Sequence, residues 1–126
     1  MPDRFAKESR SVRHQLAPVV ERVLERHGRQ PPPLAEPAGP TAPWFTLHDA
    51  SGAPLVLVSA HAGAVNFLLG KRGFVHVRPI AAVPPDHLES WFEDVLDGAL
   101  SGGLVEHGDG ERATLRTRTG AITLTS

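Results

Sequence analysis

Residues 31–43, with the sequence PPPLAEPAGPTAP, hold six of the twelve prolines in this chain. Proline fixes φ, lacks an amide hydrogen, and disfavours the helical conformation in the residue before it. Neither a long helix nor a central strand can therefore run through this stretch. We expect it to be a linker between an N-terminal helical arm, residues 1–30, and a body, residues 44–126. At 126 residues the chain has the length of one domain overall.

The composition is that of an ordinary globular protein. Hydrophobic residues make up 40% of the chain and charged residues 21%, which is enough apolar material for one core. The chain has no cysteine, so disulfides, thiolate zinc sites, iron–sulfur clusters and cysteine nucleophiles are excluded together. No apolar run has the length of a membrane span or the form of a signal peptide. We therefore predict a cytoplasmic protein.

The charges are distributed unevenly between the arm and the body. Residues 1–30 carry seven Lys or Arg against four Asp or Glu, a net charge of +3, and residues 31–126 carry six against ten, a net charge of −4. This asymmetry permits the arm to pack on its own body or on an acidic partner. The basic excess is much smaller than that of a typical nucleic-acid-binding domain.

The arm has the apolar spacing of an amphipathic helix over residues 3–27, and Gly28 is its expected C-terminal stop. Pro18 interrupts the pattern, which predicts a kink or a short break at Ala17. An apolar stripe on such a helix can be buried on its own sheet, on a second copy of the chain, or on another protein. The stripe supplies four candidate protein-binding residues: Val12, Leu16, Val19 and Val23.

Two hairpins follow the linker. The first joins strands at 44–48 and 55–59 through a turn at 49–52, and the second joins strands at 65–69 and 74–80 through Gly70-Lys71-Arg72-Gly73. The strand at 55–59 is apolar on both faces, so we expect it to lie centrally in its sheet and to be covered on each side. The exposed basic tip adds Lys71 and Arg72 to the candidate protein-binding residues.

A second amphipathic helix is predicted over residues 88–100, ended by Gly102-Gly103. Asp86 is its expected N-cap, and Glu89 completes a capping-box pattern. The helix acids, which are Glu89, Glu93, Asp94 and Asp97, should face solvent. Residues 104–126 alternate in the manner of two or three short strands. The fold class is therefore α+β: a mainly antiparallel sheet of five to seven strands, with an N-terminal amphipathic helix and a second helix inserted after the fourth strand.

No motif points to catalysis, a cofactor or a metal. The seven histidines never recur at HxH or HxxxH spacing, and no phosphate loop or nucleophile signature is present. We predict no catalytic residue, no cofactor and no metal site. His61, which lies close to Gly63, and His76 are candidate pocket residues for a small enzyme or ligand-binding domain with a pocket between helix and sheet. Asn66 lies in an apolar strand and, if buried without a partner, costs about 1–3 kcal/mol.

An arginine-rich strand face supports a weaker alternative, binding to nucleic acid. Arg112, Arg116 and Arg118 share one face of a predicted strand, and Lys71, Arg72 and Arg78 could extend it. This face lacks the aromatic side chains on which bases usually stack, and the chain has no tyrosine. We therefore expect nucleic acid to be an improbable partner.

The order of the predicted elements resembles that of small bacterial chaperone or immunity-type binding proteins. The resemblance covers topology only and implies no site residues. The first hypothesis is a non-enzymatic protein-binding or regulatory module of that type, acting through surface complementarity with another protein or a second copy of itself. The separable helix, the basic tip and an open sheet edge are the surfaces that it could use.

Overall fold

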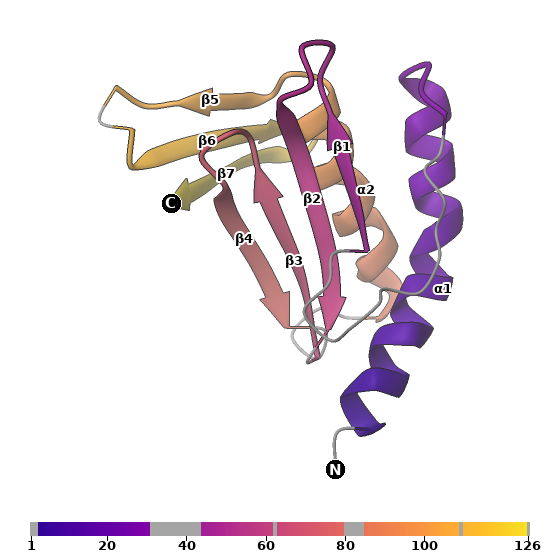
Figure 1. Cartoon of the computed structure of the whole chain (residues 1–126). Helices are drawn as coiled ribbons and strands as arrows, with labels where there is room; N and C mark the ends of the chain where they lie inside the picture. The colour runs from indigo at the N-terminus through magenta and orange to yellow at the C-terminus, as the bar shows by residue number, and fades with distance from the viewer. Residues whose placement is uncertain (1–2, 31–43, 62, 80–84, 109, 126) are drawn as a thin grey trace.

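The computed structural model describes residues 3–30, 44–61, 63–79, 85–108 and 110–125. Within these ranges the chain forms two α-helices, one short 3₁₀ helix and seven strands (Figure 1). In chain order the elements are α1 (Asp3–Arg26), β1 (Phe45–His48), β2 (Pro54–His61), β3 (Ala64–Leu69), β4 (Phe74–Pro79), η2 (Pro85–His87), α2 (Leu88–Leu100), β5 (Leu104–Glu106), β6 (Arg112–Thr117) and β7 (Gly120–Thr125). The predicted α+β class is confirmed, and the predicted linker at 31–43 lies outside the described residues.

All seven strands belong to one antiparallel sheet with the order β1-β2-β3-β4-β7-β6-β5. The sheet consists of two meanders, β1 to β4 and β5 to β7. A single residue pair, Val75 with Thr125, joins them between β4 and β7. The strands of the second meander run at a steep angle to those of the first, so the sheet is strongly curled (Figure 1).

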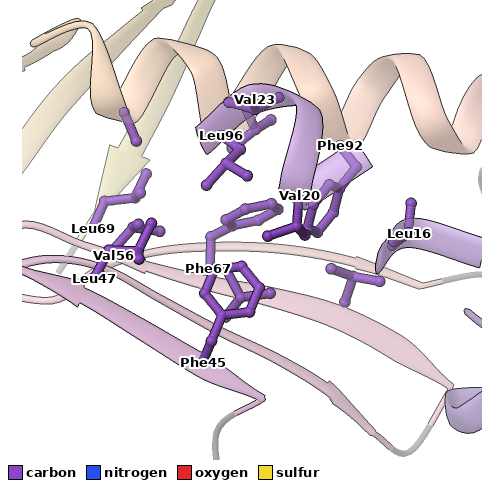
Figure 2. Packing of buried hydrophobic residues seen from close by; sticks show 14 of the residues in the cluster. Leu16, Val20, Val23, Phe45, Leu47, Val56, Phe67, Leu69, Phe92 and Leu96 are labelled. Atoms are coloured by element: carbon purple, nitrogen blue, oxygen red, sulfur yellow. The ribbon is translucent and has the colours of Figure 1, made fainter. Parts of the chain in front are cut away.

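Both helices pack on the same side of this sheet. α2 contacts β6 and β2, and α1 contacts α2 and β2. Phe67 of β3 lies at the centre of the layer between them, with its ring 5.3 Å from that of Phe92, and Val20 of α1 points into the same space (Figure 2). We expected β2 to be covered on both sides. Among the described elements, helices cover it on one side only.

Helix α1 continues through Pro18, so the alternative of a break at Ala17 is wrong. Pro18 is exposed, and its missing amide hydrogen bond therefore falls on the solvent side of the helix, where water can bond the freed carbonyl. Gly28 ends the helix as predicted. Its φ is 69°, and the amides of Gly28 and Arg29 donate to the carbonyls of Glu25 and Leu24, which is the Schellman arrangement.

The predicted capping box of α2 is wrong. The N-cap is His87, with no side-chain cap hydrogen bond, because Asp86 belongs to the short 3₁₀ helix Pro85–His87 that precedes α2. The apolar face of α2 is as predicted: Leu88, Phe92, Val95, Leu96 and Ala99 are buried. The helix ends at Leu100, just before Gly102.

Candidate functional surface

The side of the sheet opposite the helices carries an exposed apolar patch. Because side chains alternate along a strand and paired residues share a face, the register defines this outer face. One row across it consists of Thr46, Leu57, Leu68, Val75, Thr125 and Arg112. A second row consists of Ser59, Asn66 and Val77. We call Leu57, Leu68, Val75 and Val77 the outer apolar patch.

Three members of this patch are unusually exposed for their type. Leu68 is 37% exposed, Val75 41% and Val77 46%, and Leu57 is half-buried. Scattered exposed apolar side chains are normal on a protein surface. These four are neighbours on three adjacent strands, however, and contiguous apolar surface is typical of binding sites.

Asn66 lies beside the outer apolar patch, in the second row of the outer face. Its neighbours across the strands are Ser59 and Val77. Its Nδ2 atom is buried and has no hydrogen-bond partner in the described structure. Such an amide destabilises the fold by about 1–3 kcal/mol. Asn66 thus weakens the free protein at one margin of the outer apolar patch, next to Ser59, which is only 7% exposed.

The outer face becomes more polar where β7 and β6 continue it. Thr123 and Thr125 of β7 pair with Thr114 and Arg112 of β6, and Arg116 pairs with Ala121. The two arginines are exposed. The outer face is thus apolar over β2 to β4, carries hydroxyl and guanidinium groups over β7 and β6, and ends in the exposed Val105 on β5.

The four predicted protein-binding residues of the arm lie in the core instead. Val12 is 5% exposed, and Leu16, Val19 and Val23 are fully buried. They pack with the apolar faces of α2 and the sheet in one hydrophobic cluster. Of the alternatives open for this stripe, the structure shows burial on its own body. The four side chains are therefore not available to a partner while α1 stays in place.

Charged side chains at the C-terminal end of the arm pair with acids of α2, which is one of the two arrangements that the charge asymmetry left open. Glu93 Oε1 accepts from Arg22 at 2.5 Å, and Glu93 Oε2 accepts from Arg26 at 2.8 Å. Asp97 is 7% exposed and lies 2.9 Å from His27 Nε2 and 3.3 Å from Arg26 Nη1. Hydrogen bonds from Arg22 and then Arg26 lower the pKa of Glu93.

The expectation of a mainly solvated acidic face on α2 is therefore wrong for several of its acids. Glu93 and Asp97 face α1 because α1 packs beside α2, a placement that helical periodicity within α2 does not reveal. Asp94 accepts hydrogen bonds from the backbone amide of Arg118, at 3.1 Å, and from the hydroxyl of Thr119. These carboxylates connect α2 to α1 and to the turn between β6 and β7.

The basic hairpin tip is partly engaged within the chain. Arg72 donates to the carbonyl oxygen of Gly110 at 3.0 Å and lies 3.8 Å from Glu106. Lys71 is exposed and lines an open hollow of about 330 Å³, whose other charged residues are Asp49 and Glu106. Asp49 Oδ1 already accepts from Ser51 and Ala53, so this acid stabilises the β1–β2 turn.

His76 belongs to an aromatic cluster on the helix side of the sheet. Its Nε2 accepts from Trp91 Nε1 at 3.3 Å, its ring stacks on Phe67, and Arg78 lies 6.0 Å from the centroid of Trp91. Burial, followed by the charge of Arg78, lowers the pKa of His76. His76 does not line the hollow beside Lys71, and the side chain of His61 lies outside the described residues.

The predicted basic surface is divided between different parts of the fold. Arg112 and Arg116 lie on the outer face, whereas Arg118 lies 3.9 Å from Glu93 of α2 and Arg78 lies beside Trp91. Within the described part of the chain, no group of three or more His, Asp or Glu side chains could hold a metal ion. No described helix combines the length and apolarity needed to cross a membrane.

The outer apolar patch was not identified from the sequence. The sequence signal for it was that residues 55–59 are apolar on both faces of their strand. We read this pattern as a strand covered on each side, but the structure places helices on only one side of it. A scan of protein-family models and searches of curated proteins and of solved structures found no match to this chain. The candidate surface therefore rests on the geometry described above.

Proposed function

We propose that this protein is a non-enzymatic module that binds another protein through the outer face of its sheet. The observation that carries the proposal is the outer apolar patch, in which three contiguous side chains are 37–46% exposed. Burying an exposed Val or Leu fully is worth about 1.5–3 kcal/mol. A partner that covers the patch would gain less than half of that free energy for each of these side chains, because each is already more than half buried.

The remaining surfaces offer less to a partner. The apolar stripe of α1 is already buried, and the guanidinium of Arg72 at the hairpin tip already contacts Gly110 and Glu106. Asn66 adds support, because a functional surface is a place where an unpartnered polar group can persist despite its cost to stability. Surface complementarity over the outer face is thus the mechanism that we favour.

The test is a comparison of partner capture by the full chain and by a Val75→Ser/Val77→Ser variant. Val105→Ser is the control for position within the outer face: Val105 is 44% exposed and faces the same side of the sheet as Thr114, but it lies on β5, with β7 and β6 between it and the outer apolar patch. We expect at least one protein to be retained by the wild type and by Val105→Ser and to be lost with the double variant. Thermal melts of all three chains check that folding is intact.

Identical sets of retained proteins for the wild type and the double variant would contradict the proposal. Slower hydrogen exchange at the Leu68 and Val77 amides after the retained protein is added would support the proposal. The same protection pattern centred on α1 or on the hairpin tip would instead place the interface elsewhere.

A further inference from the structure

We infer that the partner binds the outer face as an extended strand, paired with the free edge of β4. The inference rests on the proposed function and specifies the conformation of the partner's segment. It starts at the junction of the two meanders, where Val75 and Thr125 form the single residue pair between β4 and β7. Beyond that pair the two strands diverge steeply (Figure 1). Over residues 76–79, none of the described strands pairs with the side of β4 that faces away from β3.

Backbone hydrogen bonds fix the direction of the peptide groups in β3. The Gly70 amide donates to the Leu55 carbonyl oxygen at 2.9 Å. These two residues flank the pair of Val56 with Leu69, and such a bond marks an antiparallel pair whose own residues exchange no hydrogen bonds. The amide and carbonyl of Leu69 therefore point away from β2, toward β4.

The same alternation identifies the backbone groups on the free edge of β4. Leu69 pairs with Phe74, so the amide and carbonyl of Phe74 point toward β3 and those of Val75 point away from it. The pairing of Val75 with Thr125 on that side agrees. Val77, two residues further, points its amide and carbonyl in the same direction. It is exposed, and no hydrogen bond joins its amide or carbonyl to another described residue on that side.

Pro79 is the next residue whose backbone faces this edge. Proline has no amide hydrogen and is confined within sheets to edge strands and bulges, which fits a strand that has a neighbour on one side only. Val77 and Pro79 together offer one donor and two acceptors. Such a row of unpaired backbone groups is complementary to an added strand. A helix bonds its own amides and carbonyls and would leave these groups unused.

The free edge of β4 is also the margin of the outer apolar patch. Side chains alternate along a strand, so every second side chain of an added strand would lie on the outer face, beside Val75 and Val77. Apolar side chains at those positions would extend the patch by one strand. The partner segment is therefore an extended one with apolar residues at alternate positions.

β7 has a free edge of its own across the split. The Arg116 amide donates to the Gly103 carbonyl at 2.8 Å, and by the same alternation the peptide groups of Leu115 point toward β7. Its partner Ile122 points back to β6, so the amide and carbonyl of Thr123 face the split. The outer side chains of this strand include threonines and no valine or leucine, so β4 is the edge that the apolar patch favours.

A second copy of the chain is a poorer occupant than a different protein. A symmetric dimer joins the same edge of both copies. Each β4 edge would then bring one amide hydrogen, that of Val77, because Pro79 has none. A strand with all its amide hydrogens can also bond to the Pro79 carbonyl.

Hydrogen exchange of the ¹⁵N-labelled full chain tests the free edge before any ligand is added. The amides of His76 and Arg78 point toward β3 and should exchange slowly, and the Val77 amide between them should exchange fast. Equal protection of all three amides would show that this edge is already paired and would overturn the inference.

The probe is a peptide of eight residues that alternates Val and Thr between two terminal Lys residues. Two further forms carry N-methyl groups on all Val or on all Thr residues. Because a strand directs alternate amides to its two edges, each form blocks pairing on one edge only. We expect the unmodified peptide and one methylated form to bind and to slow exchange of the Val77 amide. The other form should bind at least about tenfold more weakly through its lost hydrogen bonds.

A variant removes the donor from the protein instead. Val77→Pro deletes an amide that faces the free edge and leaves the bonds to β3 in place. It should weaken the unmodified peptide about fivefold. Val77→Thr, which keeps the amide and the β-branched shape, is the control and should keep most of the affinity. If Val77→Pro fails to fold, the two methylated peptides test the same point on the wild-type chain.

No binding of the unmodified peptide, or equal binding of both methylated forms, would overturn the inference. Slower exchange at Thr123 with no change at Val77 would place the strand on β7 and overturn it as well. So would a dimer in sedimentation that Val77→Pro dissociates. If Val75→Ser/Val77→Ser loses its captured protein while both methylated peptides bind equally, the proposed function stands and only the extended conformation of the partner is rejected.

Discussion

Two glycines let the end of α2 lie against the backbone of β6. A Cβ atom at Gly98 would lie 2.7 Å from the carbonyl oxygen of Arg116, and one at Gly103 would lie closer still. The Gly103 carbonyl accepts a hydrogen bond from the Arg116 amide at 2.8 Å. Backbone atoms cannot move aside as a flexible side chain can, so both positions depend on glycine.

Replacing Gly98 with Ala should therefore destabilise the protein. Alanine favours a helix interior by about 1 kcal/mol over glycine, but the clash with Arg116 should cost about 1–3 kcal/mol as overpacking does elsewhere. Urea unfolding measures the net loss. Gly108→Ala is the control, because a Cβ there meets nothing within 4 Å. A Gly98→Ala variant more stable than the wild type would show that this contact is looser than described.

His76 makes the stability of the protein depend on pH. Its folded-state pKa lies below the ordinary value of 6.5 because of burial and Arg78. The unfolded chain therefore takes up a proton first as the pH falls. The contribution of His76 is fully present above pH 6.5 and is lost as the pH falls through the folded-state pKa.

We expect His76→Gln, which keeps an acceptor for Trp91, to flatten the decline in melting temperature just below pH 6.5. The exposed His14→Gln is the control for removing one imidazole. Melting curves between neutral pH and the acid range make the comparison. If the melting temperature of the His76→Gln variant falls with pH as steeply as that of the wild type, burial of His76 does not contribute to the pH dependence.

At the scale of elements, α1 and α2 are matched in shape and in charge. Arg22 and Arg26 lie one turn apart near the C-terminal end of α1, and His27 follows directly after the helix. Their partners Glu93 and Asp97 are one turn apart on α2. Partly exposed ion pairs of this kind contribute below about 1 kcal/mol each. The apolar contacts beneath them dominate the stability, and the ion pairs fix how α1 is placed along α2.

Glu93→Gln should lower stability at neutral pH and make the protein less sensitive to acid. The lowered pKa of Glu93 means that its contribution is present above the ordinary value of 4.5 and is lost as the pH falls through the folded-state pKa. Glu89→Gln, at an exposed position of the same helix, is the control. Unfolding curves at pH 7 and in the acid range decide the result, and parallel losses for both variants would contradict it.

At the scale of the whole molecule, the arm and the body share one core. Among the side chains of α1 that the structure describes, six apolar ones are buried in it, which are Val12, Leu16, Val19, Val20, Val23 and Leu24. Each fully buried side chain contributes about 1.5–3 kcal/mol, and a domain of this kind has a net stability of only about 5–15 kcal/mol. The body therefore depends on α1 for its stability.

A chain that begins at Trp44 should accordingly fail to fold cooperatively. Its ¹⁵N spectrum should be poorly dispersed, and its apolar surface should bind a hydrophobic dye. Adding a peptide of residues 1–30 should restore dispersion at least in part. A well-dispersed spectrum of residues 44–126 alone would show that the body is independent and that α1 is the detachable arm expected from the sequence.

Periodicity within single elements was predictable from the sequence. The apolar face of α2, the hairpin around Lys71 and the stop at Gly28 follow from spacing and from local turn chemistry, which act over a few residues. The start of α2 was not predictable in this way, because a 3₁₀ turn competed with the expected cap at Asp86. The candidate site residues on α1 were recognised as an apolar stripe. The spacing within one helix does not show which surface buries that stripe.

The sequence by itself determined which elements form and which of their faces are apolar, because backbone preferences and side-chain periodicity are local. Only the tertiary structure decided how those faces are matched: α1 covers one side of β2 and meets Glu93 and Asp97, and Leu68, Val75 and Val77 remain exposed on the other side. Pairing between faces depends on contacts between residues about seventy positions apart, such as Arg22 and Glu93. A periodic pattern indicates that a face will be buried. The packing of the whole chain determines which other face covers it.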